Sequence, residues 1–257
     1  MAPLLKLGGR MFAPSLLATC LVALLCAGFA RLGLWQWHKW VHARDEWTQF
    51  ARGAGEAQPL AGRRLADVRL FQRISIEGRL DPEHQFLLDN RIARGNAGYE
   101  VLTPLTRADD GQALLIDRGW VPFTGSRAHL PEVSFASPPQ LQLTGRVANL
   151  PSAGLASGRA RPDRTSPWPK VTSYPTMPEL ESALGKPLEP RILLLDAGEP
   201  LGLLCDWQPP GLPPLRYLSY AIQWWCFAAL AVVIWALMST RRTVSSPPAT
   251  PSPPATP

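Results

Sequence analysis

Two uninterrupted apolar runs constrain this chain of 257 residues more than any other feature of its sequence. The first run covers residues 11–30 and the second covers residues 217–238, and neither contains a charged side chain. Each is long enough to cross about 30 Å of hydrocarbon at about 1.5 Å of helical rise per residue. Because a helix satisfies its own backbone hydrogen bonds in lipid, the sequence predicts two membrane-spanning helices.

The first run has an alternative interpretation as a cleaved signal peptide, with Lys6 and Arg10 before it and Ala30 at a cleavage site. The apolar core of a signal peptide usually has about 7–15 residues, which is shorter than this run. Three tryptophans follow within the next ten residues. Tryptophan collects where a helix leaves the bilayer, so these observations favour an uncleaved membrane helix.

The placement of Lys and Arg predicts the orientation of the two helices. Lys6 and Arg10 precede the first run, and Arg241 and Arg242 follow the second. Basic residues collect on the cytoplasmic side of a membrane. Those that follow the first run argue weakly for the opposite orientation, but the second run has only Arg216 at its entrance. We therefore expect both termini in the cytoplasm.

The predicted fold class is an α+β membrane protein, with two transmembrane helices flanking a β-rich extracytoplasmic domain that is an antiparallel sheet or small barrel. The formal net charge of +6 is spread along the chain, so no nucleic-acid partner is expected. The tail holds the sequence SSPPATPSPPATP, which favours disorder or polyproline structure. The expected parts are a cytoplasmic N-terminus (1–10), a first membrane helix (11–34), the β-rich domain (35–216), a second membrane helix (217–238) and a cytoplasmic proline-rich tail (239–257).

Short runs with turn signals about every ten residues fill the predicted domain, as in antiparallel sheets and small barrels. Asp110-Gly111 predicts a tight turn between the two strands of a hairpin. The sequence MPELESALG predicts a short helix that Gly185 ends, and PSAGLASGRARPDRTSPWPK predicts a loop. The strands are expected in the sequences VRLFQRISIEGRL, HQFLLDNRI, GYEVLTPLTRADDGQALLIDRGWVP, LQLTGRV and RILLLD.

Few residues are candidates for chemistry. His38 and His42 stand four apart, which places them on one helical face, but no Glu between them completes a zinc motif. An interfacial surface explains this pair better than a metal site does, and no metal is predicted. Three of the four cysteines lie in the apolar runs, so no disulfide framework is expected. No catalytic serine, Walker or dinucleotide-binding motif occurs.

Two polar pairs at predicted strand ends have a structural interpretation. Asp117 and Arg118 could pair with each other at the end of a strand, and Asn90 and Arg91 could likewise pair with each other. Neither pair has a nucleophile and base arrangement beside it in the sequence. We therefore expect both pairs to support the fold.

Four short motifs occur in order between Leu32 and Trp225: LGLWQW, GYEVLTPL, LLIDRGWVP and RYLSYAIQWW. Together they resemble the Surfeit locus protein one family, which assists assembly of haem–copper cytochrome c oxidase. The resemblance implies a non-enzymatic assembly factor in the bacterial inner membrane with its main domain in the periplasm, or in the mitochondrial inner membrane of a eukaryote. The partners it implies are oxidase subunit I, which carries haem a, other oxidase assembly factors and membrane lipid.

The resemblance also implies a haem a site at the start of the second helix, where family members carry a pattern like R-H-x-x-Y-A-x-x-W. Arg216, Tyr220, Ala221 and Trp224 match this pattern, but Tyr217 takes the place of the histidine. A neutral phenol is a poor haem ligand. The Arg216 guanidinium is suited to pair with a haem propionate.

Three interpretations of this turn stay open. Arg216 and Tyr217 could be bilayer anchors, could contact an oxidase helix as aromatic hot spots do, or could hold haem a transiently with a ligand from His38 or His42. For the whole chain, the alternatives to an assembly factor are an enzyme or transporter component of haem a handling and a membrane-anchored binding domain without a cofactor. Neither apolar run carries the intramembrane charge that is typical of transporters.

Overall fold

The computed structural model of the chain describes residues 5–7, 10–53, 55–136, 139–152, 158–209 and 211–242. It confirms the predicted fold class, because two long apolar helices flank a β-rich domain. The chain forms two compact units, one made of residues 1–45 and 211–257 and the other of residues 46–210. The proline-rich tail from residue 243 onward lies outside the described residues.

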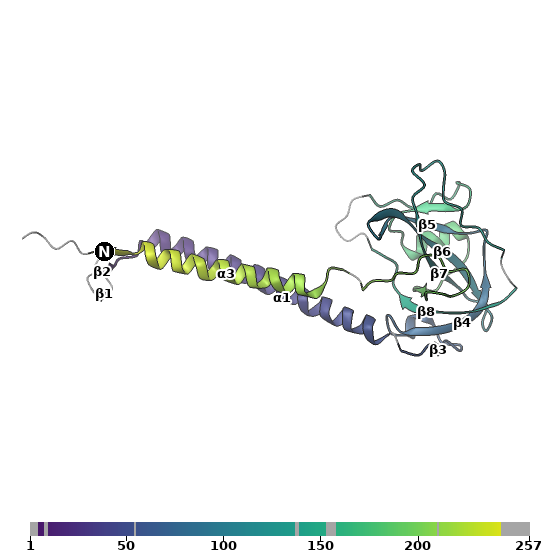
Figure 1. Ribbon diagram of the computed structural model, residues 1–257, viewed down its shortest axis with the longest axis horizontal. Coiled ribbons are helices and arrows are strands. Elements are labelled where there is room, and N and C mark those ends of the chain that lie inside the picture. The colour runs from purple at the N-terminus through teal and green to yellow at the C-terminus, as the bar shows by residue number, and fades with distance from the viewer. Residues whose placement is uncertain are drawn as a thin grey trace, which may run out of the picture. The chain divides into compact units, whose positions relative to one another are not determined.

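In the first unit, the part of helix α1 (Leu16–Arg52) up to Asp45 lies beside helix α3 (Pro214–Met238) (Figure 1). The described part of α1 continues well past residue 34, through the tryptophan-rich segment that follows the apolar run. Both helices bury residues at alternating spacings of three and four, which is the seam of a coiled coil. The seam positions are Thr19, Val22, Cys26, Phe29, Gly33, Gln36, Trp40 and Ala43 on α1, and Pro214, Tyr217, Ala221, Trp224, Ala228, Ala231 and Trp235 on α3.

Contacts along this seam show that the helices are antiparallel. The Trp235 indole N–H donates to the Thr19 hydroxyl at 3.2 Å, and the Cys26 thiol donates to the Ala228 carbonyl at 3.6 Å. Gly33 lets the backbone of α1 approach closely, because a Cβ there would lie only 2.2 Å from the indole nitrogen of Trp225.

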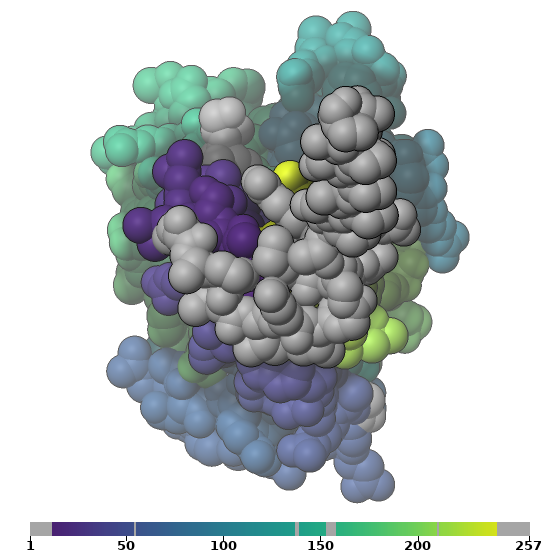
Figure 2. Space-filling view, turned by 90° about the vertical axis from the view of Figure 1, so that its left-hand side faces the viewer, coloured from purple at the N-terminus to yellow at the C-terminus, as the bar shows by residue number. Residues whose placement is uncertain are grey.

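The surface of the helix pair away from the seam is apolar and exposed, as expected of helices that meet lipid. Strands β1 (Leu5–Leu7), β2 (Arg10–Phe12) and β11 (Thr240–Arg242) form a small sheet that joins the start of α1 to the end of α3. Figure 2 views the molecule from this side, with the residues around the start of α1 in purple.

The second unit is a sheet in which five strands close into a barrel. The ring runs β4, β8, β10, β7, β6 and back to β4, through the pairing of Gly78–Leu80 with Leu105–Arg107. Closure leaves none of these five strands as a free edge over its paired length. The strands are β3 (Gln58–Pro59), β4 (Arg73–Leu80), β5 (Phe86–Ala93), β6 (Asn96–Arg107), β7 (Ala113–Pro122), β8 (Leu141–Ala148), β9 (Lys170–Thr172) and β10 (Ile192–Leu195).

Side chains alternate between the inside and the outside of the barrel, as the two-residue period of a strand requires. On β7, Leu114 and Ile116 belong to one buried cluster with residues of β4, β8 and β10. Leu115, between them, belongs to a second cluster that includes Leu180 of α2 (Met177–Leu184) and Ile192 of β10. The barrel therefore has an apolar interior and a second apolar layer that α2 covers.

Several local predictions are confirmed. Strands β6 and β7 form the predicted hairpin, and Gly111 has a φ of 70° in the turn between them. Helix α2 begins with a capping box between Thr176 and Glu179, and it ends at Gly185, which has a φ of 75°. These features depend on local sequence signals, which explains why the sequence predicted them.

Two predicted boundaries are wrong. The strand expected from Val68 begins only at Arg73, because a 3₁₀ turn η1 (Leu65–Asp67) and the left-handed backbone of Phe71 interrupt it. The loop expected up to Lys170 contains the start of β9, which pairs in parallel with β5.

Candidate functional site

The first turn of α3 carries Arg216 and Tyr217, the two candidate haem-binding residues of the family motif. Pro214 occupies the first turn of the helix, where a missing N–H is tolerated. Arg216 is exposed, whereas Tyr217 is half-buried on the seam that α3 shares with α1. The Tyr217 hydroxyl lies 4.0 Å from the position of a Cβ at Gly211. The structure thus gives Arg216 access to solvent, lipid or a ligand, and it holds Tyr217 between the helices.

The two candidate histidines lie on the other side of α1. Both His38 and His42 are exposed. The seam of α1 passes through Gln36, Trp40 and Ala43, and at about 100° per residue the two histidines point away from it. They form one face with each other, as predicted, but the geometry of α1 does not bring them to Tyr217.

Gln36 is a seam residue that sequence reasoning missed. Its Oε1 atom is buried and accepts no hydrogen bond from any described residue. Thr19 meets Trp235 and Cys26 meets Ala228, so the same antiparallel progression carries Gln36 to the level of Tyr217. The alternating three-and-four spacing in the sequence was the signal that could have identified it.

Aromatic and basic side chains surround this end of the helix pair. The rings of Trp37 and Trp40 are 4.5 Å apart, and Trp37 lies 6.0 Å from Trp225 of α3. The Lys39 ammonium lies 3.9 Å from the ring centre of Trp35. Such side chains combine apolar bodies with polar or charged ends, which suits a bilayer surface or an aromatic contact with another protein.

The DRGW motif of β7 lies in the barrel, and its first two residues do not pair with each other. Arg118 instead donates to the Gln85 side chain at 2.9 Å and to the carbonyls of Val133 and Leu201 at 3.1 and 2.8 Å. Burial lowers the pKa of Arg118 to about 10. Neighbouring residues of a strand point to opposite sides, which is why the expected Asp117–Arg118 pair does not form.

Asp117 is buried beside a second acid from the neighbouring strand. Burial and the charge of Glu100 raise the pKa of Asp117 well above its usual value. Its Oδ1 accepts a hydrogen bond from the Gly119 N–H at 3.1 Å, while Oδ2 has no donor among the described residues. Burial also raises the pKa of Glu100, although the opposite charge of Arg91 lowers it.

Arg91 pairs with Glu100 at 2.9 Å rather than with Asn90, so the expected Asn90-Arg91 pair is also wrong. Its guanidinium lies 5.4 Å from the ring centre of Tyr174. The three groups Arg91, Glu100 and Asp117 therefore place two acids and one permanent cation in the barrel wall, where a single shared proton would balance their charge.

Cys205 is a half-buried cysteine beside β7. Its thiol donates to the Arg118 carbonyl at 3.2 Å. Burial raises the pKa of the thiol to about 11, so it stays protonated and is a weak nucleophile at neutral pH. Among the described residues no group of three or more His, Cys, Asp or Glu side chains is arranged to hold a metal ion.

Comparison with known proteins places these motifs in a family context. The SURF1 family matches residues 23–229. The chain is 31% identical over 166 residues to an uncharacterized SURF1-like protein of Mycobacterium tuberculosis and equally to one of Mycobacterium bovis. The match covers 63% of this chain and 58% of each relative. A SURF1-like protein of Monosiga brevicollis is 24% identical over 191 residues, which cover 65% of this chain and 66% of the relative. The chain thus spans 58% of the length of its mycobacterial relatives.

Proposed function

Because this chain belongs to the SURF1 family, we propose that it is a membrane-bound assembly factor for haem–copper cytochrome c oxidase and not an enzyme. The observation that carries the proposal is the extent of the family match. Residues 23–229 include most of both apolar helices and the whole barrel, so the family match extends over both parts of the chain.

The barrel supports a scaffolding role because its motif residues hold the fold together. Arg118 joins β7 to the segments that carry Gln85, Val133 and Leu201. Its neighbour Cys205 is a protonated thiol that hydrogen bonds to the same strand. These side chains position the loops that they hydrogen bond to.

We propose that the membrane helices expected at residues 11–34 and 217–238, the first of which begins at Leu16 in the structure, span the membrane with both termini in the cytoplasm. The two helices that are long and apolar enough to cross a bilayer support this topology. The barrel would then lie in the periplasm of a bacterium or the equivalent mitochondrial compartment. The basic residues at positions 6, 10, 241 and 242 support the orientation.

The proposed partner is oxidase subunit I, with other assembly factors and lipid around it, and the proposed contact is the outer end of the helix pair. The tryptophans of α1 and the first turn of α3 offer exposed aromatic and cationic groups there, including Trp35, Trp37 and Arg216. Aromatic and Arg side chains are the usual anchors of protein interfaces.

Capture of a tagged chain from membranes tests this contact. Newly synthesised subunit I should co-purify with the native chain. It should be recovered at several-fold lower yield with the double variant Trp35→Ala and Trp37→Ala. As a matched control, Leu24→Ala removes an exposed apolar side chain from the lipid-facing part of the same helix and should leave recovery unchanged. Equal recovery with all three chains would contradict the contact.

A more specific proposal is that the chain carries haem a, and substitutions of Tyr217 test it. If Tyr217 replaces a ligating histidine, the native chain should retain little haem a, and Tyr217→His should co-purify with more. His38→Ala and His42→Ala test the two exposed histidines as substitute ligands. Absorption spectra of the purified proteins measure the bound haem.

Two spectral results would contradict this account of the turn. Stoichiometric haem a on the native chain that Tyr217→Phe abolishes would make the tyrosine itself a ligand. The absence of haem from every variant, with oxidase still assembling, would leave the turn as a bilayer anchor and partner contact.

A further inference from the structure

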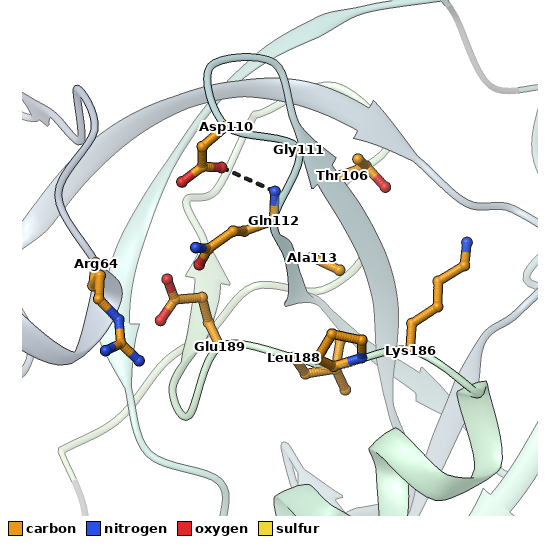
Figure 3. Close-up of a pocket in the computed structure, with 10 residues that line it drawn as sticks. Arg64, Thr106, Asp110, Gly111, Gln112, Ala113, Lys186, Leu188 and Glu189 are labelled. Carbon is orange, nitrogen blue, oxygen red and sulfur yellow. Dashed lines mark hydrogen bonds between the residues drawn. The ribbon is translucent and has the colours of Figure 1, made fainter.

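A cavity of about 540 Å³ lies at one end of the barrel, remote in sequence from the helix motifs. Its walls are the turn between β6 and β7, the segment before β10 and the segment before η1 (Figure 3). Cavities that hold small ligands have volumes of about 300–1,000 Å³. The charged side chains that line it are Arg64, Asp110, Lys186 and Glu189.

Glu189 is the unusual group in this cavity. The residue is only 3% exposed, and neither of its carboxylate oxygens accepts a hydrogen bond from a described residue. Its backbone N–H donates to the Ala113 carbonyl at 2.8 Å, which fixes the residue against the start of β7. A buried carboxylate without donors is costly, and a donor from water or a ligand in the cavity would reduce that cost.

Arg107 is the nearest cation to Glu189, but its guanidinium already donates hydrogen bonds to other acceptors. Its Nη1 atom lies 3.9 Å from a Glu189 oxygen, which balances the charge without a hydrogen bond. Its Nε donates to the Asp109 carboxylate at 2.9 Å, and its Nη1 donates to the Arg63 carbonyl at 3.0 Å and lies 3.1 Å from an Asp110 oxygen. Both oxygens of the Glu189 carboxylate therefore lack a donor among the described residues, in a side chain that lines the cavity.

Two exposed cations border the same space. Figure 3 shows Arg64 and Lys186 on different sides of it, with the Glu189 carboxylate and the β6–β7 turn between them. The lining thus carries two cationic and two anionic side chains, so a ligand with both a positive and a negative group can pair with each kind.

We propose that this cavity binds an α-amino acid unit, either a free amino acid or the N-terminal residue of a polypeptide. Its ammonium group would donate to the Glu189 carboxylate, whose oxygens have no donor among the described residues. Its carboxylate or carbonyl oxygen would accept from Lys186 or Arg64. The proposal is independent of oxidase assembly, because it rests on the barrel cavity alone.

Titration calorimetry on the full chain in detergent tests the proposal with four probes. L-alanine represents a free amino acid, and L-alanyl-L-alaninamide represents a polypeptide N-terminus. N-acetyl-L-alanine lacks the ammonium, and ethylammonium lacks the acceptor oxygen. We expect saturable binding of at least one of the first two probes, and at least tenfold weaker binding of the last two.

Substitutions then locate the site. Glu189→Gln should weaken binding at least tenfold, whereas Glu56→Gln, at an exposed glutamate that does not line the cavity, should leave it unchanged. Lys186→Met and Arg64→Met alter exposed residues, so they keep the test decisive if Glu189→Gln does not fold, and at least one of them should weaken binding.

Binding of alanine alone would identify a free amino acid as the ligand, and binding of the dipeptide amide would identify a polypeptide end. If neither probe binds, or if binding survives Glu189→Gln or both rim variants, the proposal is overturned. Oxidase assembly is not part of this measurement, so such a failure would leave the proposed function untouched.

Discussion

Replacing Asp117 by Asn should make the stability of the barrel less dependent on pH. The pKa of buried Asp117 is raised well above its ordinary value of 3.8 by burial and by the charge of Glu100. The folded protein therefore keeps this proton at pH values where the unfolded chain has lost it. The resulting stability is fully present below pH 3.8 and is lost as the pH rises through the folded pKa.

The magnitude follows from proton linkage. Each proton held only by the folded state changes the free energy of unfolding by about 1.4 kcal/mol per pH unit within that window. About 1 kcal/mol shifts the Tm of a domain of 150–250 residues by roughly 2–4 °C, so the Tm of the native chain should fall about 3–6 °C per pH unit more steeply than that of Asp117→Asn. Burial also raises the pKa of Glu100, which the substitution leaves in place, so we expect some decline to remain.

Near-ultraviolet circular dichroism of the full chain in detergent, recorded from pH 4 to pH 8, measures this difference. Asp206→Asn removes an exposed carboxylate and should melt with the native pH slope. If Asp117→Asn and the native chain lose Tm in parallel over this range, the buried acid does not carry a proton in the folded state, and the reasoning is refuted.

Two further predictions concern the hairpin and the topology. Gly111 has a φ of 70° with open space around its Cβ position, so only backbone strain disfavours Gly111→Val. The substitution should reduce the free energy of unfolding by about 1–3 kcal/mol, measured as a lower Tm. An unchanged Tm would mean that the turn accepts a β-branched residue without strain. Alkaline phosphatase fused after Gln140 should be active and fused after Thr243 inactive, and the reverse pattern would overturn the proposed orientation.

The local features of this fold were predictable because each depends on a short segment. The apolar runs predicted the two helices, and Asp110-Gly111 predicted the hairpin of β6 and β7. Barrel closure could not be read in this way. It needs Gly78 to pair with Arg107, and it needs β10 to pair in parallel with β7, although these segments are far apart in the sequence.

The environment of the acids in the barrel could not be predicted for a related reason. Asp117 and Glu189 are charged residues, which are usually exposed, and the sequence does not show that the fold buries them. The expected Asp117–Arg118 ion pair was wrong because neighbouring residues of a strand face opposite sides. Arg91 pairs with Glu100 of the adjacent strand β6 rather than with Asn90.

The most direct test of the central claim is the haem a content of membranes from cells that lack this chain. The reduced-minus-oxidised absorption of haem a in cytochrome oxidase should fall several-fold on deletion of the gene, together with oxygen consumption from reduced cytochrome c. Both should return with the native chain, whereas subunit I should be synthesised at the normal rate throughout. Full haem a absorption and full oxidase activity in the deletion strain would contradict a role in oxidase assembly.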